Sequence, residues 1–283
     1  MRTLGVDVSH WEGSIDWKLA APTIGFAYYK CTDGVRFVDD QFASNRQGCN
    51  AAGLAHAPYH YYQPLLDPIA QADHFIRTAG KGYGRYIVDL EEPERLEGIT
   101  SKLQLFLERV QQLTAIKPAI YTSAGYWNEF IHPKSAWSKE YDLLVAHYTL
   151  AHSPLLPIGW TTWRIWQFTD YWFFPGCNSA ADGNWFNGNA EECKAWFGNS
   201  TVAEARQPEE GSIRLHLLPS LRSLFDGLNI RQSPDMKARI TGKLEKGEMV
   251  EVEEVGGFDV WVRHARGWTA VERGGYRYME VIK

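Results

Sequence analysis

Two carboxylates, Asp89 and Glu91, stand two residues apart at the end of a short apolar run that is typical of a buried strand. In a strand, residues i and i+2 point to the same side, with Cα atoms roughly 6–7 Å apart. Neighbouring carboxylates push their pKa values apart, so that one can hold a proton near neutral pH while the other stays ionised. Cleavage of a glycosidic bond needs this division of labour. The pair therefore predicts an acid–base centre.

Further polar residues follow other strand-like runs. The acids are Asp7, at the end of the run 3–8, and Asp182, after the last run of the same region. In a β/α barrel, functional groups collect at the C-terminal ends of the strands. We therefore expect Asp7, Asp89, Glu91 and Asp182 to form the catalytic group. The residues expected to bind substrate beside them are Lys30, Asp33, Tyr62, Tyr121, Trp166 and Gln167.

Two other interpretations of the acids stay open. Glu92, Glu94 and Glu97 follow the pair, so the segment could be a solvated acidic loop. Four acids could also ligate a divalent cation, although no HxH or HxxxH pair accompanies them. Because the aromatic surroundings suit a sugar better, we expect no metal and no cofactor at this site.

Strand-like and helix-like segments alternate over residues 1–198. Several strand candidates are nearly continuous apolar runs, as in strands buried on both faces, and this alternation predicts a parallel β/α architecture. With seven or eight strands in fewer than 200 residues, we expect a compact barrel. The strand candidates are 3–8, 24–30, 55–62, 85–90, 118–122, 143–147 and 164–168, and the helix candidates are 38–52, 68–79 and 100–113.

The chain changes character after residue 198. Residues 199–226 contain Ser, Thr, Pro and Gly clusters typical of a linker. Residues 227–283 hold short β-patterned runs split by Gly-containing turns, which predict a small all-β barrel. The charge also divides, because residues 1–200 carry 16 basic and 21 acidic residues whereas residues 201–283 carry 13 of each.

Composition excludes several function classes. The net charge of −5 argues against a nucleic-acid partner, and the chain lacks a run of about 18 apolar residues that could span a membrane. The N-terminus has no apolar signal segment, so we expect either synthesis without a signal or a truncated secreted form. The four cysteines form no CxxC, and we expect free thiols.

The region from Gly5 to Gly188 resembles glycoside hydrolase family 25, the lysozymes or N-acetylmuramidases. Eight blocks occur in the family's order: GVDVSHWEGSIDW (5–17), FAYYKCTDG (26–34), APYHYY (57–62), IVDLE (87–91), AIYTS (119–123), LVAHY (144–148), WQF (166–168) and DGNWFNG (182–188). The resemblance implies a flattened eight-stranded β/α barrel. It also implies hydrolysis of the β-1,4 bond between N-acetylmuramic acid and N-acetylglucosamine in peptidoglycan.

The same resemblance assigns roles to the acids. Glu91 matches the general acid, and Asp89 matches the acid that assists the 2-acetamido group or stabilises positive charge. Asp7 and Asp182 match the flanking aspartates. Asp33 departs from the family, which often has Glu at that position, and a Gly stands where an apolar residue often follows Asp182. Both departures affect how the substrate is bound, and neither changes the pair Asp89 and Glu91.

Residues 227–283 resemble a bacterial Src-homology-3-like domain, on the strength of LNIRQSP (228–234), GKLEKG (242–247) and two tryptophan-containing runs, 261–263 and 267–268. The resemblance implies binding of the cell wall, and we expect a monomer acting outside the cell, after release by a holin or after secretion. Two alternatives stay open: a wall-binding protein without catalysis, and a hydrolase of another N-acetylhexosamine polymer such as chitin.

Overall fold

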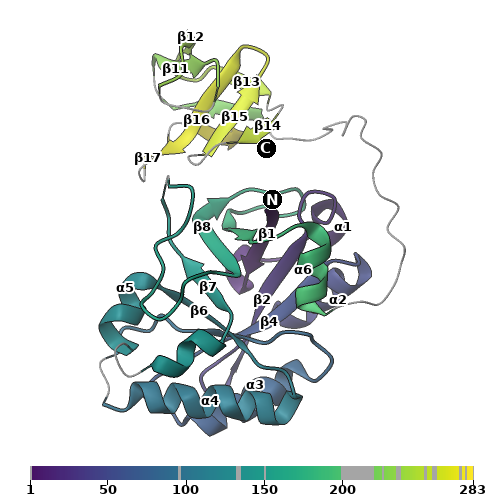
Figure 1. Ribbon diagram of the computed structural model, residues 1–283. Coiled ribbons are helices and arrows are strands. Elements are labelled where there is room, and N and C mark those ends of the chain that lie inside the picture. The colour runs from purple at the N-terminus through teal and green to yellow at the C-terminus, as the bar shows by residue number, and fades with distance from the viewer. Residues whose placement is uncertain are drawn as a thin grey trace. The chain divides into compact units, whose positions relative to one another are not determined.

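Short apolar strands pair side by side until the first one meets the last. In the computed structural model, eight strands close into a barrel in the order β1, β2, β4, β5, β6, β7, β8, β9 and back to β1, which confirms the expected β/α barrel (Figure 1). The strands are β1 (Thr3–Val8), β2 (Phe26–Asp33), β4 (Ala55–Tyr61), β5 (Ile87–Asp89), β6 (Ala119–Ser123), β7 (Leu143–Ala146), β8 (Ile165–Trp172) and β9 (Ala181–Phe186). A two-residue strand, β3 (Phe37–Val38), folds back on the end of β2.

The structure describes residues 2–198 except 95–96, 132–134 and 150, and residues 220–282 except 225, 234–236, 252–253, 257–259, 274–275 and 278. The chain divides into two compact units, Met1–Glu204 and Ala205–Lys283. Seven of the barrel strands are parallel to one another, as expected. The eighth, β9, runs antiparallel to both β1 and β8, which corrects the expectation of an all-parallel sheet.

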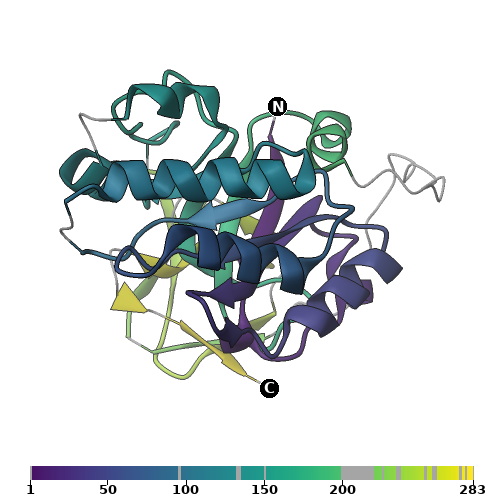
Figure 2. The same cartoon turned by 90° about the horizontal axis from the view of Figure 1, so that it is seen from below.

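Helices cover the outside of the barrel. The predicted helix 68–79 is confirmed as α3 (Pro68–Ala79), where Asp67 accepts a hydrogen bond from Ala70 N–H and Pro68 occupies the first turn. It lies beside α4, as two views show (Figures 1 and 2). The helices are α1 (Trp17–Ala20), α2 (Phe42–Ala51), α3, α4 (Ile99–Thr114), α5 (Ala124–Tyr126) and α6 (Ala190–Phe197), with shorter turns η1 (His10–Glu12), η2 (Trp127–Ile131) and η3 (Ala136–Glu140).

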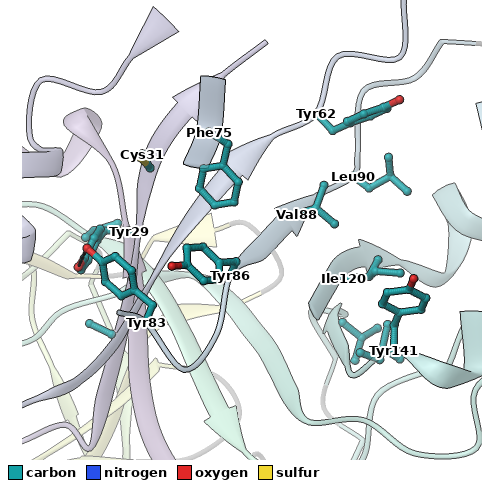
Figure 3. Packing of buried hydrophobic residues seen from close by; sticks show 14 of the residues in the cluster. Tyr29, Cys31, Tyr62, Phe75, Tyr83, Tyr86, Val88, Leu90, Ile120 and Tyr141 are labelled. Carbon is teal, nitrogen blue, oxygen red and sulfur yellow. Dashed lines mark hydrogen bonds between the residues drawn. The ribbon is translucent and has the colours of Figure 1, made fainter. Parts of the chain in front are cut away.

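Alternation along the strands produces two separate apolar cores. Side chains at one set of alternate positions pack under the helices, among them Tyr29, Val88 and Ile120 (Figure 3). Side chains at the other set fill the barrel, among them Tyr28 and Ile87. Because both faces of each strand are buried, residues at both sets of positions are held rigidly.

The barrel is closed at the N-terminal ends of its strands. Phe26 lies 6.3 Å from Phe186 and 5.4 Å from Phe197 of α6, measured between ring centroids. Gly5 faces this cluster, and a Cβ there would lie 2.5 Å from the Phe26 ring. A packed floor leaves only the opposite end, at the C-terminal ends of the parallel strands, open for a site.

The second unit is all-β in its described part. Two sheets form it, β13–β10–β18 and β12–β11–β16–β15–β14, and β17 pairs with β16. Residues 220–223, expected in the linker, belong to strand β10 because they pair with β13 and β18. Residues 199–219 of the expected linker lie outside the described residues. The strands are β10 (Ser220–Ser223), β11 (Leu228–Arg231), β12 (Ile240–Leu244), β13 (Met249–Glu251), β14 (Glu254–Gly256), β15 (Val260–His264), β16 (Gly267–Arg273), β17 (Tyr276–Arg277) and β18 (Met279–Ile282).

All four cysteines are free thiols, as expected; Cys31, Cys49 and Cys193 are buried and Cys177 is partly exposed. Among the described residues, no helix is long and apolar enough to cross a membrane.

Candidate active site

The four predicted acids all lie at the open end of the barrel. Asp7 and Asp89 are near or at the ends of β1 and β5, and Glu91 follows β5 by two residues. Asp182 reaches the same end because β9 is antiparallel, so that its first residues lie beside the last residues of β1. Asp7 and Asp182 stand directly opposite each other in the β1–β9 register.

The amide of Gln167 links Asp7 and Asp182. Its Nε2 donates to Asp7 Oδ2 at 3.0 Å and to Asp182 Oδ2 at 3.1 Å. Its Oε1 accepts from the hydroxyls of Tyr121 and Tyr148, at 2.8 and 2.7 Å. Because the oxygen is held by two hydroxyl donors, the amide nitrogen is turned toward the acids.

Asn184 holds Asp7 from the neighbouring strand. Its Nδ2 donates to Asp7 Oδ2 at 2.6 Å, and its Oδ1 accepts from the Tyr28 hydroxyl at 2.8 Å. Asp7 is thus a buried carboxylate with amide donors on one oxygen. Bonds of this kind favour the charged form and fix the direction of the carboxylate.

Burial raises the pKa of both members of this pair. For Asp7, burial raises the pKa and the amide hydrogen bonds oppose the rise. For Asp182, burial followed by the charge of Asp7 raises the pKa to about 10. Ionising two carboxyl groups that stand directly opposite each other is energetically unfavourable, so the pair holds a proton at neutral pH.

Asp89 and Glu91 differ in their exposure. Asp89 is 8% exposed, and its Oδ1 has no hydrogen-bond partner among the described residues. Its pKa is raised well above the usual range by burial, then by the charges of Glu91 and Asp7. The side chain of Glu91 is exposed to solvent. Its pKa is raised because the protein around the carboxyl partly removes it from water, and then by the charge of Asp7. Lys30 lowers the pKa of both carboxyls.

Lys30 and Asp33 form an ion pair at the end of β2. Lys30 Nζ lies 3.2 Å from Asp33 Oδ2, while Gln63 Nε2 donates to Asp33 Oδ1 at 2.9 Å. Lys30 also lies 4.6 Å from the centre of the Tyr61 ring, whose hydroxyl donates to Glu92 at 2.9 Å. The pair therefore places a cation beside the acids of β5.

Two expected substrate-binding residues do not face this site. Tyr62 and Trp166 are 0% exposed and belong to the core under the helices, in which Figure 3 shows Tyr62. The Tyr62 ring packs against that of Phe106. Trp166 donates from Nε1 to the carbonyl of His147. Alternation is the reason, because their neighbours Tyr61 and Gln167 occupy the positions that point into the barrel.

Four polar residues at the site were missed by the sequence reasoning. Asn184 follows Asp182 by two residues and so shares its face, a signal that the sequence contained. Tyr61 could have been found by the same spacing, two residues beyond Tyr59. Nothing in the sequence pointed to Tyr148 as a partner of Gln167 or to Gln63 as a partner of Asp33, since both contacts depend on how loops cross the barrel mouth.

This arrangement can perform acid-assisted bond cleavage. Glu91 is a solvent-accessible carboxyl with a raised pKa, so it holds a proton to higher pH than an ordinary glutamate. Asp7, whose amide hydrogen bonds favour its charged form, can supply negative charge where a cation would develop. In the described part of the chain, no three His, Cys, Asp or Glu side chains are arranged to hold a metal ion.

Comparison with known proteins agrees with this geometry. The sequence pattern of "Glycosyl hydrolases family 25" matches residues 6–177. Lysozyme M1 of Streptomyces globisporus is 30% identical over 212 residues, covering 69% of this chain and 71% of its own. The uncharacterized protein YegX of Escherichia coli K12 is 31% identical over 202 residues, covering 68% of this chain and 72% of its own.

A solved structure shares the barrel. The bacterial lysozyme from Streptomyces coelicolor superposes with a TM-score of 0.64 and 28% identity, covering 70% of this chain and 97% of that one. The matched segment of the sequence contains Asp7, Asp89 and Glu91. The chain belongs to family 25 of the glycosyl hydrolases.

Proposed function

We propose that this chain is a lysozyme that cleaves the β-1,4 bond between N-acetylmuramic acid and N-acetylglucosamine in peptidoglycan. The observation that carries the proposal is the pairing of a solvent-accessible carboxyl, Glu91, with a buried one, Asp89, at the open end of a family 25 barrel. The names of its relatives, a lysozyme and an N,O-diacetylmuramidase from Chalaropsis sp, support the substrate class.

In the proposed mechanism, Glu91 donates its proton to the glycosidic oxygen as the bond to the leaving sugar breaks. Positive charge then develops at the anomeric carbon, where the carboxylate of Asp7 and the carboxyl oxygens of Asp89 stabilise it, and water adds to that carbon while a proton returns to Glu91. Asp182, sharing a proton with Asp7, tunes the charge of that carboxyl.

Gln167 and Tyr121 serve this mechanism as positioning residues. Gln167 is 2% and Tyr121 7% exposed, so both hold the acids from behind. The ion pair of Lys30 and Asp33 is partly exposed and stands closer to the substrate's path. We therefore assign Lys30 and Asp33, not Gln167 and Tyr121, to direct contact with the sugar.

The test is clearing of purified bacterial walls by the wild type, Glu91→Gln and Glu97→Gln. Loss of a general acid costs about 10²- to 10⁴-fold in rate. Glu97 is an exposed acid of the same segment and serves as the matched control. We expect wild type and Glu97→Gln to release new reducing ends of muramic acid, and Glu91→Gln to lose at least 99% of the rate while melting like the wild type.

Retention of more than a tenth of the rate by folded Glu91→Gln would remove Glu91 from its role. Cleavage of chitin but of no bacterial wall would replace the substrate with another N-acetylhexosamine polymer. Wall binding without any released ends would favour the non-catalytic alternative.

For the second unit we propose wall binding by a Src-homology-3-like domain, with the chain acting as a monomer outside the cell membrane. The all-β sheets of its described part support this. Trp268 in β16 is partly exposed. Sedimentation of catalytically silenced Glu91→Gln with insoluble walls should fall when Trp268→Ala is added, and equal sedimentation would argue against a role for this face.

A further inference from the structure

The three exposed large aromatic side chains in the described part of the chain all border the open end of the barrel. Trp11 follows β1, Phe37 begins β3 and Tyr148 follows β7, with exposed fractions of 79%, 42% and 51%. Tyr148 is explained by its hydrogen bond to Gln167. Trp11 and Phe37 take no part in the proposed chemistry, so their exposure needs another cause.

Trp11 is held in place despite its exposure. It lies in the 3-10 turn η1, whose N-terminal end is held by a capping box in which Ser9 Oγ accepts from Trp11 N–H and Glu12 Oε2 accepts from Ser9 N–H. Its ring lies 4.6 Å from the ring of His10, at 35° between planes. His10 in turn bonds through its backbone N–H (3.0 Å) and Nδ1 (2.7 Å) to the buried carboxylate of Asp39. An exposed indole on a capped and anchored turn is a preformed flat surface.

Phe37 is anchored in the same way. Its carbonyl lies 2.9 Å from Nε2 of His74 in α3, and the neighbouring Val38 is 44% exposed. The Phe37 ring lies 5.8 Å from that of His10 and 5.8 Å from the ammonium of Lys30. Lys30, Phe37, His10 and Trp11 therefore form a row of successive neighbours that begins at the cation beside the acids.

We infer that this row, the Trp11–Phe37 ledge, is a binding subsite for a sugar ring of the glycan strand lying beyond the sugars next to the cleaved bond. The inference rests on the proposed function. The exposed rings of Trp11 and Phe37 flank His10, at 4.6 and 5.8 Å between ring centroids. Flat aromatic faces suit the C–H face of a sugar, while His10 and Lys30 offer polar partners at its edge.

Continuity with the acids distinguishes this occupant from others. A glycan strand held at Asp89 and Glu91 is already tethered, so an adjacent ledge needs only modest affinity to hold the next sugars. A stem peptide or a second copy of the chain could bind elsewhere on the surface, so neither explains why the exposed rings continue from the acids. The ledge should thus favour long glycan strands over short ones.

The test compares kcat/KM for wall glycans of eight and four sugars, stripped of stem peptides, in wild type, Trp11→Ala, Phe37→Ala and Trp11→Tyr. Trp11→Ala should lower the ratio of the two values by about tenfold, equivalent to ~1.4 kcal/mol. Trp11→Tyr should retain most of the ratio because it keeps a flat ring. Leu105→Ala, at an apolar position on α4 that is about as exposed as Phe37, is the control and should keep the wild-type ratio.

A second readout does not require turnover. Binding of chitohexaose to Glu91→Gln should change its tryptophan fluorescence, and Trp11→Phe in that background should abolish most of the change. The inference would be overturned if Trp11→Ala left the ratio unaltered or lowered kcat/KM equally for both glycan lengths. It would also be overturned if removal of Trp11 converted a dimer to a monomer. If the wild type cuts no glycan but chitohexaose still gives the Trp11 signal, the proposed function fails while the ledge stands.

Discussion

Replacing Asp182 by Asn should make the first unit more stable. The native pair of Asp7 and Asp182 holds two carboxyl groups in one register position. An asparagine of the same shape would keep an oxygen to accept from Gln167, and its amide would offer Asp7 a donor in place of the shared proton. The change therefore removes the cost of holding that proton without removing a hydrogen bond or opening a cavity.

The size of the effect follows from the raised pKa of Asp182. Because its pKa is about 10 in the folded state, the native protein keeps a proton that the unfolded chain releases once the pH passes about 4. This carboxyl therefore costs stability that is absent below about pH 4 and grows as the pH rises toward 10. At ~1.4 kcal/mol per pH unit, the cost reaches ~4 kcal/mol at pH 7. The side chain is partly exposed and Asp7 shares its proton, so solvent screening reduces the expected gain to about 2 kcal/mol.

Thermal unfolding of the full chain between pH 5 and 8 measures this gain. Ten of the twelve tryptophans lie in the first unit, so their fluorescence follows its unfolding. About 2 kcal/mol corresponds to a rise in Tm of roughly 4–8 °C for a domain of this size. The rise should widen with pH. Asp40→Asn, which removes an exposed acid that does not affect the pKa of Asp182, should change Tm little. A Tm for Asp182→Asn at or below that of the wild type at pH 8, or a difference independent of pH, would refute the reasoning.

Three further substitutions test the site and the barrel. Lys30→Met removes a charge that lowers the pKa of Glu91, so the alkaline limb of kcat/KM against pH should move to higher pH. An unchanged limb would mean that Lys30 does not influence the pKa of the catalytic acid. Trp166→Phe loses the indole hydrogen bond and should lower the free energy of unfolding by about 1–3 kcal/mol while KM stays unchanged. A raised KM at constant Tm would instead indicate that Trp166 contacts the substrate. Gly5→Ala places a methyl group against the Phe26 ring and should lower the free energy of unfolding by about 1–3 kcal/mol. An unchanged Tm would show that the barrel interior can accommodate the methyl group.

Much of the barrel was predictable because its strands carry a strong local signal. The run 3–8 matches β1 in full, and 55–62 matches β4 to within one residue. These strands are buried on both faces and therefore stand out as apolar runs. The direction of β9 was not predictable, because an antiparallel strand has the same composition as a parallel one. That direction decides whether Asp182 reaches Asp7.

The facing of single residues was harder to predict for a related reason. The segment 59–62 has aromatic or imidazole side chains at every position, so its pattern gives no contrast between inside and outside. Tyr62 was placed at the substrate although it lies in the outer core, and Tyr61 was overlooked. At 166–167 the usual expectation is reversed, since the polar Gln167 points into the barrel and the apolar Trp166 points away from it.

This reversal has an energetic consequence for the whole site. The barrel interior is apolar at its floor, near Phe26 and Phe186, and polar at its mouth, where acids face one another at a cost in stability. Such a cost persists only if the surrounding structure prevents the acids from moving apart. The two apolar cores supply that constraint, since β5 and β9 contribute residues to both cores and β1 contributes residues to the outer one. Substitutions that relieve the repulsion should therefore stabilise the fold and lower the activity together, whereas substitutions that loosen the outer core should lower both.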